Sequence, residues 1–160
     1  MTNNIWVSFQ AFAGGITFGA FTVYVLIQNG LVLGALGATL STTAPRALRF
    51  WSLILPHGVI ELMAIFIAAG AGLILGWSLI APGNVSRWDA LRKASRDALP
   101  LVGGVVAMLI VAGCIEGFIT PSPLPARLKL AFAGLTAIGL TLYFSRAGRQ
   151  VREPQGGQLR

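Results

Sequence analysis

Charged side chains are scarce in this chain. Lysine, arginine, aspartate and glutamate make up 11% of the 160 residues, whereas an average soluble domain contains about 25%. Hydrophobic residues make up 55% of the chain, and the mean hydropathy is +0.75. The shortage of charge argues against a water-soluble globular domain. It predicts that lipid surrounds most of the chain.

Other absences exclude further classes of protein. The single cysteine, Cys114, cannot form an intrachain disulfide. The motifs of serine hydrolases, phosphate-binding loops and dinucleotide-binding folds are missing, and no cofactor is expected. No signal peptide is expected either, because no basic segment and cleavage site accompany the first apolar block. The formal charge is +7, but nearly all of the basic residues lie in connections and the tail. We therefore expect no nucleic-acid partner.

Four long apolar blocks are present. They run over residues 9–40, 50–80, 99–119 and 128–144. The last two match single membrane-spanning helices, which take about 20 residues each. The blocks predict an all-α, polytopic transmembrane helical bundle. Residues 1–145 would form one transmembrane domain, and residues 146–160 a basic cytoplasmic tail.

The first two blocks are longer than one crossing requires, and each contains residues that break helices. Asn29 and Gly30 interrupt the first block, and Pro56 and Gly58 interrupt the second. One interpretation is four full spans with two short or broken helical segments between the first two, packed on the bundle as a re-entrant hairpin. In this interpretation the full spans are 9–28 and 60–80, and the short segments are 30–40 and 48–56. The alternative is two long, kinked helices.

Basic residues predict the orientation. One group lies between the second and third spans and another follows the last span: Arg87, Arg92, Lys93 and Arg96, then Arg146, Arg149 and Arg152. Basic connections stay on the cytoplasmic side of a membrane. Two spans separate the groups, so both can face the cytoplasm. The N-terminus and the C-terminus are then both expected to be cytoplasmic.

Glycine occurs 20 times, and four pairs of glycines are spaced one helical turn apart. Small residues at this spacing let helices approach closely in a membrane. The pattern predicts tight packing within the bundle or a seam in a homo-oligomer. The pairs are Gly15 and Gly19, Gly30 and Gly34, Gly72 and Gly76, and Gly113 and Gly117.

Ionisable residues inside the apolar blocks are candidate site residues, because they are costly in lipid and usually face a partner or a cavity. His57, Glu61 and Glu116 are such residues. Counted from the basic connection, both glutamates lie in the outer half of the membrane. Asn29 and Thr120 are expected at a similar level, so we predict one polar cluster of His57, Glu61, Glu116, Asn29 and Thr120.

Three roles for this cluster remain open. Its members can satisfy one another and fix the fold, or they can bind a proton, an ion or a ligand beside broken helices. A metal site built from His57, Glu61 and Glu116 would suit an intramembrane metal-dependent hydrolase. Because His-x-x-x-Glu is a weak pattern for metal binding, no metal ligands and no catalytic residues are predicted.

Several segments together resemble the stage II sporulation protein M family of bacterial membrane proteins, over roughly residues 4–145. The segments are Phe12–Gly19, Asn29–Gly34, Leu55–Glu61, Phe66–Gly72 and Ile115–Thr120. The resemblance implies an all-helical protein of the bacterial cell (inner) membrane. In spore formers it implies a complex with two peptidoglycan-degrading enzymes.

We therefore expect a non-enzymatic scaffold or assembly protein of the cell envelope. Its expected partners are the lipid bilayer and other envelope proteins, including peptidoglycan hydrolases. The alternative is a small transporter or channel component that uses the outer-leaflet histidine and glutamates. The family supplies no catalytic residues to transfer to this chain.

Overall fold

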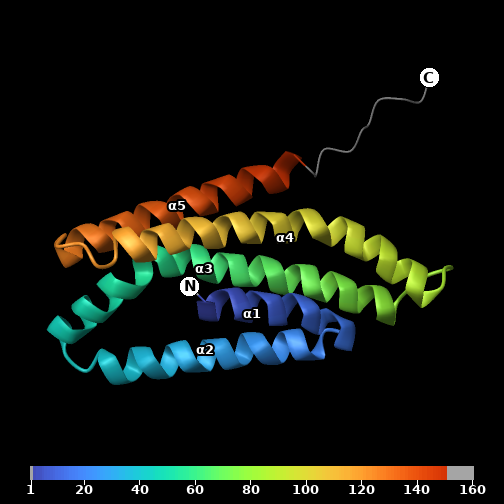
Figure 1. Cartoon of the computed structure of the whole chain (residues 1–160), viewed down its shortest axis with the longest axis horizontal. Coiled ribbons are helices and arrows are strands. Elements are labelled where there is room, and N and C mark those ends of the chain that lie inside the picture. Colours follow the sequence, from blue (N-terminus) through green and yellow to red (C-terminus); the bar gives the residue numbers. More distant parts are fainter. Residues whose placement is uncertain (1, 151–160) are drawn as a thin grey trace.

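The computed structural model describes residues 2–150, with side chains described as far as Ala147. Within this range the chain is helical and contains no strand, which confirms the predicted all-α class. Successive helices run in alternating directions along the long axis of the molecule (Figure 1). The elements are α1 (Thr2–Ala13), a short 3-10 helix η1 (Gly14–Thr17), α2 (Ala20–Leu40), α3 (Ala44–Ile80), α4 (Arg87–Phe118) and α5 (Ala126–Gln150).

Four of these helices are long and apolar enough to cross a membrane. They are α2, α3, α4 and residues 126–147 of α5. The 12 residues of α1 extend only about 18 Å. The chain is thus a multi-pass membrane protein with four candidate spans, as the apolar blocks predict.

The first span differs from the prediction of one helix over 9–28. The chain reverses direction at residues 14–19 and separates α1 from α2. Phe18 has φ 57° and Gly19 has φ 83°, a left-handed conformation that does not continue a right-handed helix. The Thr22 hydroxyl then donates a hydrogen bond to the Ala11 carbonyl (2.7 Å), which ties α2 back to α1.

The predicted helix break at Asn29 and Gly30 is wrong. Both residues lie inside the uninterrupted α2, and segment 30–40 is its second half rather than an arm of a hairpin. A glycine inside a helix costs only about 1 kcal/mol relative to alanine. Unpaired backbone groups in hydrocarbon cost several kcal/mol each, so the helix continues through Asn29 and Gly30.

The second block forms the long, kinked helix of the alternative interpretation, so the separation into 48–56 and 60–80 is wrong. Pro56 and Gly58 both lie inside α3. The helix changes direction in the part that contains Pro56 (Figure 1). Proline removes one backbone donor and crowds the preceding turn, which bends a helix without ending it.

Helix α3 is the centre of the bundle and contacts every other helix. Its buried positions are mostly alanine and glycine, including Ala64, Ala68 and Ala71. Gly72 and Gly76 of α3 pack against the 14–19 turn. A Cβ added at Gly76 would lie 2.7 Å from the Gly19 nitrogen, and one at Gly72 would lie 2.8 Å from the Phe12 carbonyl oxygen. Two of the four glycine pairs noted in the sequence therefore pack against each other inside the bundle.

The basic segments are more helical than predicted. Helix α4 begins at Arg87 rather than near residue 99, because the Ser86 hydroxyl accepts a hydrogen bond from the Asp89 amide (3.1 Å) and caps the helix. Helix α5 continues to Gln150, past the predicted start of the tail at 146. Residues 151–160, including Arg152, lie outside the described residues. The start of α4 and the end of α5 lie toward the same end of the molecule (Figure 1).

Candidate functional site

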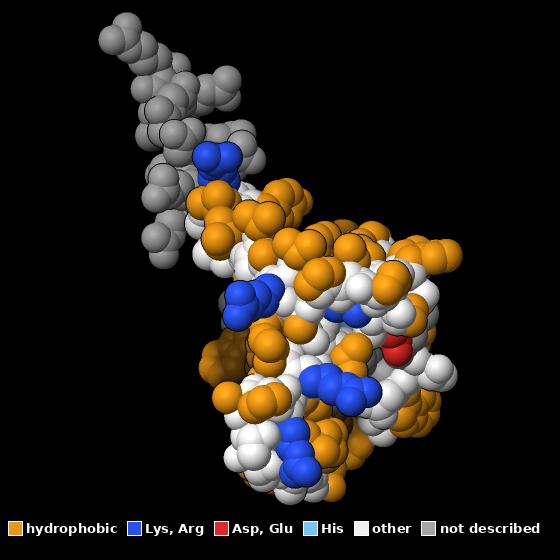
Figure 2. All heavy atoms as spheres, turned by 90° about the vertical axis from the view of Figure 1, so that its left-hand side faces the viewer, with side chains coloured by type: hydrophobic (Ala, Val, Ile, Leu, Met, Phe, Trp, Pro, Cys, Tyr) orange, Lys and Arg blue, Asp and Glu red, His pale blue; other side chains and the backbone are white. Residues whose placement is uncertain are grey.

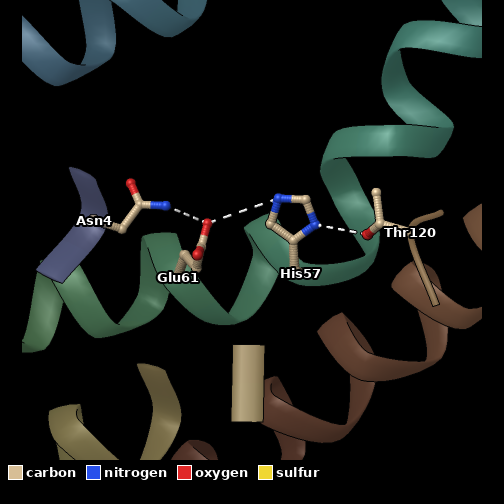
Figure 3. Close-up of polar contacts among 4 residues, drawn as sticks. All are labelled: Asn4, His57, Glu61 and Thr120. Atoms are coloured by element: carbon tan, nitrogen blue, oxygen red, sulfur yellow. Dashed lines mark hydrogen bonds and ion pairs between the residues drawn. The ribbon is translucent and has the colours of Figure 1, made fainter. Parts of the chain in front are cut away.

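Glu61 is the most deeply buried acidic residue described in this chain, with 4% of its surface exposed. Its Oε2 atom accepts a hydrogen bond from the Asn4 amide of α1. One helical turn earlier on α3, His57 places its Nε2 atom 3.9 Å from the same oxygen (Figure 3). Residues four apart lie on one face of a helix, and this face of α3 points toward α1 and the α4–α5 connection.

The other ring nitrogen of His57 contacts a different element. A hydrogen bond joins His57 Nδ1 to the Thr120 hydroxyl in the α4–α5 connection (3.1 Å, Figure 3). The ammonium group of Lys129, on the first turn of α5, donates to the carbonyls of Thr120 (2.7 Å) and Ser122 (2.9 Å). We name the series Asn4, Glu61, His57, Thr120 and Lys129 the polar chain.

The polar chain connects α1, α3, the α4–α5 connection and α5. Lys129 is only 6% exposed, and its ammonium group faces carbonyl oxygens just after the end of α4. The C-terminal end of a helix carries partial negative charge, which stabilises a cation there. The arrangement thus pairs buried charged groups with dipoles and hydrogen bonds rather than leaving them in contact with lipid.

One carboxylate oxygen remains without a partner. Among residues 2–150, three buried side-chain oxygens form no hydrogen bond: Glu61 Oε1 and the hydroxyls of Ser8 and Ser41. Buried polar atoms nearly always have a partner. The unpaired oxygen therefore leaves room at Glu61 for one further hydrogen bond. Glu61 is therefore the side chain of this site that can accept an additional hydrogen bond.

The structure brings together only some of the predicted residues. His57, Glu61 and Thr120 are in contact. Glu116 lies on α4, partly buried and within electrostatic range of His57. No hydrogen bond among residues 2–150 links Asn29 to the polar chain. The prediction took residue 29 as the end of a span, whereas it lies in the middle of α2.

Sequence reasoning missed Asn4 and Lys129. Lys129 is an ionisable residue inside the apolar block 128–144, so the rule that selected Glu61 also applied to it. Asn4 precedes the first apolar block and has no comparable signal. Among residues 2–150, no three histidine, cysteine or acidic side chains are grouped so that they could hold a metal ion.

Comparison with known proteins identifies relatives of this chain. An uncharacterized protein of Methanocaldococcus jannaschii is 34% identical over 122 residues, which cover 76% of this chain and 68% of that protein. A second uncharacterized protein of the same organism is 27% identical over 105 residues, which cover 64% of this chain and 47% of that protein. No solved structure matches the chain.

The family comparison agrees with the resemblance seen in the sequence. The stage II sporulation protein M profile matches residues 1–121. This range includes α1 to α4 and four members of the polar chain, and it ends before Lys129. A match over three quarters of the chain, on a four-span helical bundle, shows that this protein belongs to the stage II sporulation protein M family.

Proposed function

We propose that this protein is a non-enzymatic scaffold of the cell envelope. The surfaces of its spans that face away from the bundle would bind other envelope proteins, including peptidoglycan-degrading enzymes. The basic 81–98 segment and the C-terminal end of α5 would lie in the cytoplasm, and the α2–α3 and α4–α5 turns outside it. Helix α2 starts at the same end as the basic segments, so the first full span would also begin on the cytoplasmic side.

The exposed face of α2 supports this proposal most directly. Only 11% of the most apolar stretch of α2 is buried, compared with 56% for α3. A Cβ added at Gly30 or Gly34 would meet nothing within 4 Å. A helix surface that contacts only lipid can carry large apolar side chains as well as glycine. Close contact with another helix requires small residues. Two glycines one turn apart on an uncovered span are typical of a helix that packs against a partner.

Site-specific photocrosslinking in native membranes tests the proposal. A photoreactive residue at Leu31, beside the glycine face of α2, should form adducts with an envelope protein. The same residue at Ile110, on the exposed side of α4, is the lipid-facing control. Gly34→Leu should abolish the Leu31 adduct by blocking close approach, and Ala107→Leu on α4 should not. Lipid adducts alone at Leu31 would contradict the scaffold.

A second candidate function is a small transporter or channel component, and the unpaired Glu61 oxygen favours it. Transport requires a continuous polar path, yet α3 carries no ionisable side chain from Leu62 to Ile80. Proton flux into vesicles containing the purified protein distinguishes the two functions. The scaffold predicts a flux equal to that of empty vesicles. Transport predicts a flux that Glu61→Gln abolishes.

A further inference from the structure

A second site lies at the turn between α2 and α3, at the end of the molecule opposite the basic cytoplasmic segments. It is a pocket of about 320 Å³, lined by Thr39 and Leu40 of α2 and by Arg46, Arg49, Phe50 and Leu53 of α3. Figure 2 views this end and shows basic side chains set among hydrophobic ones. None of the six residues belongs to the polar chain, and the family resemblance assigns them no role.

The two arginines of the pocket carry uncompensated positive charge. Arg46 and Arg49 are three residues apart, so they share one face of α3. Arg46 donates one hydrogen bond to the Thr42 hydroxyl (3.3 Å). Among residues 2–150, the guanidinium group of Arg49 forms no hydrogen bond, and neither arginine forms an ion pair. Both are free to bind an anion, and guanidinium groups match phosphate geometry well.

The remaining walls of the pocket are apolar. Leu40 is 47% exposed and Leu53 is 40% exposed, although both belong to membrane-spanning helices. Phe50 lies between the two arginines and Leu53 in the α3 sequence. The pocket therefore offers cationic and apolar surface together at the edge of the membrane, where head groups meet acyl chains.

We propose that this pocket binds an anionic phospholipid of the surrounding leaflet. Arg46 and Arg49 bind its phosphate, and Leu40, Phe50 and Leu53 contact the upper part of its acyl chains. A phospholipid fits better than an acidic segment of a partner protein. The apolar walls face lipid, and a polar peptide would make no favourable contact with them. The proposal does not depend on the scaffold function.

Native mass spectrometry of the full chain, purified in mild detergent, tests the lipid site. The protein is titrated with phosphatidylglycerol and with phosphatidylcholine of the same acyl chains. We expect the protein to retain phosphatidylglycerol in preference to phosphatidylcholine. The Arg46→Gln, Arg49→Gln double variant should bind phosphatidylglycerol about tenfold more weakly. Arg127→Gln removes an exposed charge at the same end of the molecule and is the control. Equal retention of both lipids, or an equal loss in the Arg127 variant, would overturn the proposal.

A second variant tests the location of the site independently of charge. Thr39→Trp fills the pocket and leaves both arginines in place. Within the described part of the chain, the Thr39 hydroxyl bonds only to carbonyls of its own helix. The protein should therefore still fold, which thermal unfolding verifies. Lower phosphatidylglycerol retention is expected. Unchanged retention would place the anion elsewhere. Displacement of the lipid by a soluble polyglutamate peptide would assign the pocket to a protein partner.

Discussion

Glu61 and Asn4 depend on each other across two helices. Glu61→Leu removes the acceptor of the Asn4 amide and leaves a partly buried donor unpaired, which should lower the free energy of unfolding by about 1–3 kcal/mol. Glu61→Gln keeps an acceptor oxygen and should lower it by less. Denaturant unfolding in detergent measures both variants. Equal destabilisation by Leu and Gln would show that charge, rather than hydrogen bonding, holds the polar chain together.

Lys129 contributes to stability through its two carbonyl contacts. Lys129→Met keeps the length and apolar stem of the side chain but removes both hydrogen bonds from the α4–α5 connection. Hydrogen bonds to charged groups contribute about 1.5–3 kcal/mol each, so a clear loss of thermal stability is expected. Arg127→Gln, at an exposed position nearby, should change the melting temperature little. Similar melting temperatures for the Lys129 variant and the wild type would mean that burial of the charge offsets the two bonds.

At the scale of helices, the glycines of α2 and α3 should respond in opposite ways to alanine. Gly72→Ala and Gly76→Ala each push a Cβ into the backbone of α1 or the 14–19 turn, where backbone cannot move aside cheaply. Overpacking of this kind costs about 1–3 kcal/mol. Gly30→Ala faces open space and replaces a poor helix former, so stability should be unchanged or slightly higher.

Thermal unfolding of the three glycine variants in one detergent gives the comparison. The measurement also tests whether α2 is continuous. If residues 29 and 30 formed a helix break, Gly30→Ala would destabilise the protein as strongly as Gly72→Ala.

At the scale of the whole molecule, the topology is testable by cysteine labelling. The native Cys114 is exposed, so it is first replaced by alanine. Cysteines at Asn84 and Ser145 should both be protected from an impermeant reagent outside intact cells, because both lie at the basic end of the bundle. A cysteine at Thr43, in the α2–α3 turn, should react. Asn84 is preferable to Ser86, whose hydroxyl caps α4. Labelling of only one of Asn84 and Ser145 would refute the proposed topology.

Composition and hydropathy by themselves determined the class of this protein. Little charge and long apolar blocks leave only membrane helices, because hydrocarbon offers no partners to unpaired backbone groups. The same logic selected His57 and Glu61, since ionisable residues in apolar blocks need partners. The same logic applies to Lys129 inside the last block, although the sequence analysis did not select that residue. These inferences depend only on whether lipid or water surrounds each residue, and the hydropathy of a sequence segment indicates this directly.

Tertiary structure alone decided where the helices break and which polar groups meet. Gly30 and Pro56 both weaken a helix locally, yet the chain passes through both and reverses instead at Phe18 and Gly19, where the turn fits against Gly76 of α3. That choice depends on contacts between segments more than 50 residues apart in the sequence. The partnership of Asn4 with Glu61 has the same origin, because α1 reaches Glu61 only after the chain reverses at residues 14–19 and α3 packs against it.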